Sequence, residues 1–161
     1  MDLPFLIYKG VFEMRLWHKE LIPVLPRLQL LSQWRECCSI AKAIQEDGTP
    51  GHILVNRVLD YPADHFLQYA QYIRDEMVSR KYNCNWQRFS KWVGNFFRYV
   101  PFANVFPNWH DDIYLRECLY NLEEKAICGG IPAEEWQLIY ERFKDFTPLW
   151  NGVNNEKEAG C

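Results

Sequence analysis

Leu25-Pro-Arg-Leu-Gln-Leu-Leu-Ser-Gln-Trp-Arg-Glu-Cys-Cys38 is the stretch around which the chain is organised. Its apolar residues recur at spacings of three and four and so share one face of a helix: Leu30, Leu31, Trp34, Cys37 and Cys38. Pro26 suits the first helical turn, where its missing N–H is not needed. The pattern predicts a helix from Pro26 to about Gln45.

Arg35 and Glu36 lie at the edge of this apolar face or point away from it. An arginine beside a glutamate would suit a site that needs one acid and one contact to a phosphate. The alternative is a solvated ion pair on an ordinary amphipathic helix, and spacing alone favours that alternative.

The composition indicates one domain, because 161 residues with 16% aromatic side chains can bury a sizeable core. A net charge of −3 gives no general support for nucleic-acid binding. The charge is uneven, however, since residues 77–110 contain no Asp or Glu. This basic window contains five cations: Arg80, Lys81, Arg88, Lys91 and Arg98.

The six cysteines are expected to be reduced thiols in a cytoplasmic protein, because they are adjacent or scattered and form no CxxC pair. Residues 1–13 are expected to be an N-terminal extension, with a possible second start at Met14. The extension is apolar but short and has no basic leader, so we expect neither a signal peptide nor a membrane span.

Four further helices are expected from the same periodicity, at residues 62–82, 86–99, 111–128 and from 132 onward. Residues 19–26 are expected to be irregular, and residues 52–59 to be a short extended or helical piece. Asp111 and Asp112 place acid at the start of one helix, and Gly129 ends it. The apolar side of this helix is expected at Ile113, Leu115, Cys118, Leu119, Leu122 and Ala126. The sequence therefore predicts an all-α, single compact domain of about five helices over residues 14–147, followed by a polar C-terminal tail at 148–161.

The basic window could bind DNA, with cations on phosphates and Trp86, Phe97 or Tyr99 stacking on bases. The alternative, which we favour for most of these aromatic residues, is that they belong to the core. The four histidines have no metal-ligand spacing, and His110 with Asp111 suits a helix cap better. No phosphate-binding loop is present either, so we expect no metal and no cofactor.

Residue order adds a resemblance. Met14-Arg-Leu-Trp-His-Lys-Glu-Leu-Ile-Pro23, together with the stretch ending at Cys38, resembles the small pyrimidine-dimer DNA glycosylases with AP-lyase activity, the phage endonuclease V type and its bacterial relatives. The similarity is weaker in three later segments: Gly51-His-Ile-Leu-Val-Asn-Arg57, residues 65–83, and Tyr120-Asn-Leu-Glu-Glu-Lys125. It implies an all-α, endonuclease V-like domain that acts as a monomer on damaged double-stranded DNA.

The resemblance also implies the chemistry. The family's nucleophile is the α-amine of the mature N-terminus, which forms an imine with the sugar. Its essential carboxylate matches Glu36, and its neighbouring arginine matches Arg35. A basic residue near the DNA-binding face matches Lys125. We add Arg88 and Lys91 from the basic window as expected DNA contacts.

The sequence departs from the family at the nucleophile. Counted back from Glu36 without gaps, Met14 falls on the initiator methionine and Arg15 falls on the small residue whose amine reacts. Thirteen residues precede Met14, and an internal amide is not a nucleophile. Three hypotheses follow: a glycosylase with its amine at Met14 or Arg15, a non-catalytic DNA- or protein-binding helical module that kept the fold, or a cytosolic helical domain with no role on nucleic acids. Absence of salt-dependent DNA binding would favour the third.

Overall fold

The structure is a computed structural model that describes residues 14–93 and 104–152. All regular elements of these residues are helical, which confirms the all-α prediction. They comprise two 3-10 helices and five α-helices: η1 (Lys19–Val24), α2 (Arg27–Asp47), η2 (Asn56–Asp60), α3 (Ala63–Ser79), α4 (Trp86–Val93), α5 (Asp112–Ile127) and α6 (Ala133–Phe143).

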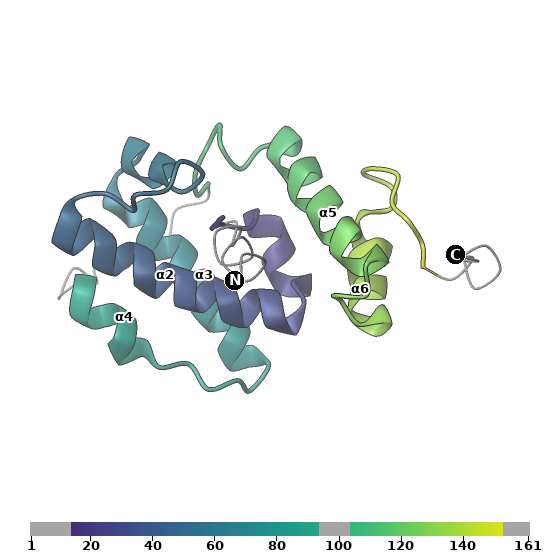
Figure 1. Cartoon of the computed structure of the whole chain (residues 1–161), viewed down its shortest axis with the longest axis horizontal. Helices are drawn as coiled ribbons and strands as arrows, with labels where there is room; N and C mark the ends of the chain where they lie inside the picture. Colours follow the sequence, from purple (N-terminus) through teal and green to yellow (C-terminus); the bar gives the residue numbers. More distant parts are fainter. Residues whose placement is uncertain (1–13, 94–103, 153–161) are drawn as a thin grey trace, which may run out of the picture.

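Helix α2 crosses the middle of the larger group of helices, with α3 behind it and α4 along one side (Figure 1). Its inner face is buried at Leu30, Trp34, Cys37 and Cys38, as the spacing predicts, whereas Leu31 is only half-buried. Helices α5 and α6 pack against each other on the other side of η1 (Figure 1). Burial of one apolar stripe on each helix thus builds a shared core.

The ends of α2 and α5 follow local sequence signals. Gly48 adopts φ +74° and donates its backbone N–H to the Ile44 carbonyl, which ends α2 two residues after the predicted Gln45. Asp111 caps α5 by accepting a hydrogen bond from the Tyr114 backbone N–H at 2.9 Å, so the capping prediction is confirmed. Gly129, at φ +79°, follows the end of α5.

Three local predictions were wrong or incomplete. Residues 19–26 are not wholly irregular, because η1 forms there and the His18 side chain caps it through the Glu20 backbone N–H. Ile113 is 65% exposed and does not join the apolar side of α5. It lies two residues from the buried Leu115, and two residues turn a helix by about 200°. Helix α3 ends at Ser79, because Lys81 adopts a left-handed φ of 61°.

The predicted helix at 86–99 is present as α4 up to Val93, and its remainder lies outside the described residues. The predicted extension at 1–13 also lies outside them. Trp150, within the predicted tail, packs on Trp136 with ring centroids 6.5 Å apart. The Trp136 Nε1–H donates to the Trp150 carbonyl at 2.8 Å, so the ordered chain continues past residue 148.

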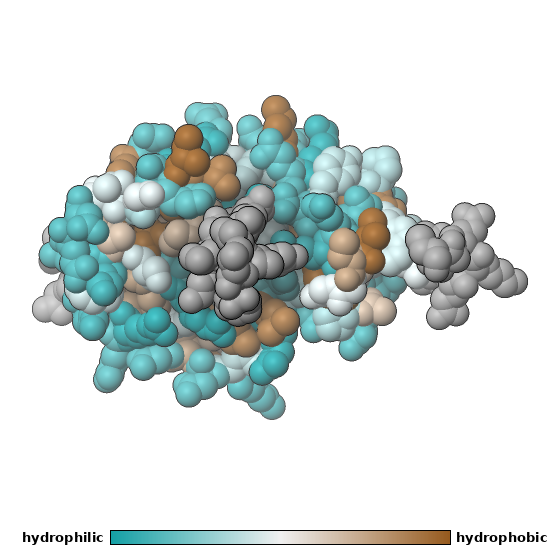
Figure 2. Space-filling view, in the orientation of Figure 1, coloured by the Kyte–Doolittle hydropathy of each residue, from teal (hydrophilic) through white to brown (hydrophobic). Residues whose placement is uncertain are grey.

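The face seen in Figure 2 is mainly hydrophilic, with apolar side chains in separate spots. Large apolar side chains that are exposed singly are normal on soluble domains. Over the described ranges, no helix has both the length and the apolar character needed to cross a bilayer.

Candidate functional site

Glu36 faces the N-terminal segment of the described chain, residues 14–18. Its carboxylate accepts a hydrogen bond from the Arg15 backbone N–H and a second, at 2.9 Å to Oε2, from Gln33 Nε2. The structure therefore brings the nitrogen of residue 15 to the carboxylate of Glu36. These are the two groups that the sequence match pairs as amine and acid.

The segment around Arg15 is tied down by side chains from three helices. The hydroxyl of Tyr69 on α3 donates to the Trp17 carbonyl at 2.6 Å. The hydroxyl of Tyr114 on α5 donates to the Leu16 carbonyl at 2.7 Å, and Gln33 on α2 contacts residues 15 and 17. The position of the Arg15 nitrogen is thus set by contacts that are far apart in sequence.

Burial is the main reason that the pKa of Glu36 differs from its usual value. It raises the pKa of this carboxyl from 4.5 to about 7. The hydrogen bonds from Gln33 and the Arg15 N–H, and the positive charge of Arg15, act in the opposite direction but are smaller. Near neutral pH both protonation states are populated, as a group that takes up and releases protons requires.

The Arg15 side chain folds inward and is only 8% exposed. Its guanidinium lies 5.3 Å from the Trp17 ring centroid, a cation–π distance, and a hydrogen bond links the side chain to Cys118. Arg35, by contrast, is exposed on α2. Of the two arginines beside Glu36, only Arg35 is presented to solvent, where a phosphate could reach it.

Residues 14–89 match the family model described as pyrimidine dimer DNA glycosylase. This match supports the family that the sequence suggests. It spans a little under half of the chain and contains the N-terminal segment, α2, α3 and the start of α4. Neither the curated proteins nor the solved structures yielded a match. At the level of the family, the match supports a pyrimidine-dimer-glycosylase-type function with DNA as substrate.

The histidines beside this segment act as hydrogen-bond acceptors. The rings of His18 and His110 stack at 5.0 Å, and His110 Nδ1 accepts from the Lys19 backbone N–H at 3.0 Å. Burial lowers the pKa of His110 to about 2, which keeps its ring neutral. The described part of the chain contains no group of three metal-ligating side chains.

Lys19 carries a second amine near the segment. Its Nζ donates to the Asn104 side chain and, at 2.8 Å, to the Val105 carbonyl. Burial lowers the pKa of Lys19, although Glu20 partly offsets this effect. The two acceptors keep this amine in a structural role, which makes it a poorer nucleophile than a free α-amine.

The basic window divides into structural and exposed cations. Arg80 is structural, since its Nη1 donates to the Leu25 carbonyl at 2.7 Å and its Nε pairs with Glu76 at 2.6 Å. Arg88 and Lys91 are exposed on α4 and can face a phosphate. Phe97 and Tyr99, two of the proposed stacking residues, lie outside the described residues.

Two other predicted DNA contacts are placed by the structure. Trp86 stacks on Trp34 at 5.8 Å and lies under the Arg74 guanidinium, so it packs against the core and not outward. Lys125 is exposed in the last turn of α5, roughly 16 Å along the helix axis from Tyr114. The structure therefore does not bring Lys125 beside the Glu36 site.

The sequence did not indicate a role at this site for three residues: Gln33, Tyr69 and Tyr114. Gln33 lies one turn before Glu36 on a mostly apolar face, and Tyr69 follows the apolar spacing of α3. A polar atom at a core position needs a hydrogen-bond partner, so a polar side chain on an apolar face was the feature of the sequence that could have indicated these residues.

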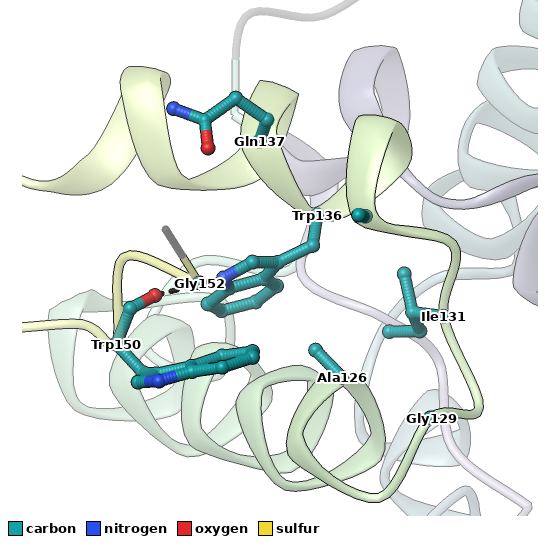
Figure 3. Close-up of a pocket in the computed structure, with 8 residues that line it drawn as sticks. Ala126, Gly129, Ile131, Trp136, Gln137, Trp150 and Gly152 are labelled. Atoms are coloured by element: carbon teal, nitrogen blue, oxygen red, sulfur yellow. Dashed lines mark hydrogen bonds between the residues drawn. The ribbon is translucent and has the colours of Figure 1, made fainter. Parts of the chain in front are cut away.

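A pocket lies away from this site, between α5, α6 and the chain that follows α6. Figure 3 shows the rings of Trp136 and Trp150 on one side of it, with Ala126 and Ile131 nearby. None of its lining residues comes from α2, which carries Glu36.

Proposed function

We propose that this protein is a DNA-repair glycosylase with AP-lyase activity, acting on pyrimidine dimers or related base damage. The observation that supports the proposal is the contact between the nitrogen of residue 15 and the carboxylate of Glu36. An amine at that position would have its proton acceptor already in hydrogen-bond range.

In the proposed reaction the neutral amine attacks C1′ of the damaged nucleotide. The C1′–N glycosidic bond breaks, and the base leaves with the electron pair and takes up a proton. The nitrogen then loses one proton, and its lone pair expels O4′ from C1′. O4′ takes up a proton as the sugar ring opens, and a protonated imine remains at C1′. A proton then leaves C2′, and the C3′–O bond breaks to release the 3′-phosphate, which cuts the strand. Ionised Glu36 stabilises the cationic sugar and carries protons to and from the nitrogen.

An α-amine suits this chemistry because its pKa of about 7.7–8.0 leaves an appreciable neutral fraction near pH 7.5. A backbone amide has no usable lone pair, so the proposal requires a chain whose first residue is Arg15 or Met14. A terminus at Met14 would place the amine one residue before the nitrogen that contacts Glu36. We therefore favour Arg15 as the reactive residue and Met14 as the alternative.

The proposed DNA contacts are Arg35, Arg88, Lys91 and Lys125. Arg35 lies closest in sequence to Glu36, and Arg88 and Lys91 extend the exposed positive surface along α4. We further propose that the protein is cytoplasmic, which the free thiols of the described cysteines favour. We also propose that it acts as a monomer.

The test compares three forms of the protein that start at Met1, Met14 and Arg15, with each terminus confirmed by mass spectrometry. Borohydride reduction on abasic DNA traps the imine as a covalent adduct. We expect the highest yield from the Arg15 form and much less from the Met1 form. In the Met1 form the nitrogen of residue 15 is a backbone amide, and the free amine lies at Met1. Lys19→Met in the Arg15 form is the control, and its yield should be unchanged.

Equal trapping by all three forms would show that residue 15 does not supply the nucleophile. No trapping by any form, combined with salt-dependent DNA binding, would instead support the non-catalytic binding module.

A further inference from the structure

Gln33 is a fully buried side chain whose two polar atoms both contact the N-terminal segment. Its Oε1 accepts from the Trp17 backbone N–H at 2.7 Å and lies 2.9 Å from the Tyr69 hydroxyl. Its Nε2 donates to the Arg15 carbonyl at 3.0 Å and to Glu36 Oε2 at 2.9 Å.

These partners determine which way the amide points. If the amide were flipped, its NH₂ group would face the Trp17 N–H, donor against donor. Its oxygen would face the Arg15 carbonyl and the Glu36 carboxylate, acceptor against acceptor. Each such mismatch leaves a buried polar group unsatisfied, so the observed orientation is strongly preferred.

We propose that Gln33 is a positioning residue that holds the Glu36 carboxylate and the nitrogen of residue 15 against each other; this inference rests on the proposed function. A single NH₂ group binds the carbonyl of residue 15 and the carboxylate of Glu36. Gln33 and Glu36 are three residues apart on α2 and so lie on the same side of the helix. The amine and its proton acceptor are therefore held by one rigid element.

The other groups that interact electrostatically with Glu36 come from each neighbouring part of the structure. Arg15, from the N-terminal segment, favours the ionised form. Cys37 on α2 and Tyr69 on α3 are buried, which raises the pKa of both and keeps them neutral. Loss of the Gln33 donor would leave the Arg15 charge and backbone N–H as the remaining stabilisers of the carboxylate. Ionisation of Glu36 would then become harder.

The test follows the Glu36 carboxyl by ¹³C NMR across pH in the full chain and in Gln33→Met. Met has a similar volume and cannot donate, so the midpoint of the Glu36 titration should rise by about one pH unit. The matched control is Gln29→Met, one turn earlier on α2, which should leave the midpoint unchanged. In the Arg15 form, Gln33→Met should also lower imine trapping at pH 7 about fivefold, because a midpoint one unit higher leaves about one tenth of Glu36 ionised in place of about one half. The acidic limb of the pH profile of trapping should move to higher pH.

A second variant, Gln33→Glu, keeps the side-chain shape and places a carboxylate beside Glu36. Repulsion between like charges should raise the Glu36 midpoint further than Gln33→Met does. An unchanged midpoint and pH profile in either folded variant would overturn the proposal. Loss of the folded state by both variants would assign Gln33 to fold stability alone and would also overturn it. A midpoint shift in a protein that never traps the imine would support the contact but reject the glycosylase function.

Discussion

Replacing Glu36 by Gln should make the protein inactive but more stable at neutral and alkaline pH. The pKa of Glu36 rises from 4.5 to about 7 in the folded protein because burial disfavours the charged form. Below pH 4.5 both the folded and unfolded states are protonated, and the group costs nothing. Between pH 4.5 and 7 the unfolded state releases its proton first, so the free energy of unfolding falls as pH rises.

The decrease in the free energy of unfolding caused by Glu36 is complete above pH 7 and amounts to about 3 kcal/mol. Glu36→Gln cannot ionise and keeps an oxygen that can accept from Gln33. We therefore expect the variant to match the wild type near pH 4 and to exceed its unfolding temperature by roughly 6–12 °C at pH 8. Imine trapping by the Arg15 form of the same variant should be abolished. A gain in stability with loss of activity is typical of a residue kept for function.

The assay is thermal unfolding followed by circular dichroism from pH 4 to pH 8. The control is Glu46→Gln, because Glu46 is exposed on the same helix and its replacement should leave the unfolding temperature at pH 8 close to that of the wild type. If Glu36→Gln were no more stable than the wild type at pH 8, the Arg15 and Gln33 donors would outweigh burial. The reasoning would then be refuted.

The other predictions concern the cations. Arg88→Ala with Lys91→Ala should weaken DNA binding and reduce the slope of log affinity against log salt by about one per lost phosphate contact. Arg142→Ala on α6 is the control. An unchanged slope in the double variant would place both cations off the interface. Arg80→Ala should lower stability by about 1–3 kcal/mol in chemical denaturation, because it leaves the Leu25 carbonyl without its side-chain donor. If the stability loss were absent and DNA binding fell instead, Arg80 would be a phosphate contact after all.

Local sequence patterns were enough for the five α-helices and most of their ends, but not for η1. The three- and four-residue spacing placed the buried face of α2, and Asp111 marked the start of α5. Such signals act over one or two turns, so a linear sequence contains them in full. Ile113 is an exception: it is apolar, but its angular position on α5 turns it away from the buried Leu115 and leaves it 65% exposed.

The candidate site could be predicted only in part. The resemblance paired Glu36 with residue 15, and the structure places the two groups in contact. The resemblance could not show that Gln33 links the two groups or that Tyr69 contacts Gln33 and Trp17. The sequence also offered Arg80 as a possible phosphate contact, whereas the structure uses it to join α3 to the chain before α2.

The sequence by itself predicted the all-α class, the five α-helices and the pairing of Glu36 with residue 15. The tertiary structure decided the protonation behaviour of Glu36 and the hydrogen bonds around it. The reason is physical. Tyr114 and Leu16 meet across 98 residues, and Tyr69 and Trp17 across 52. Burial and hydrogen bonding depend on such distant partners, and no local pattern along the chain records them.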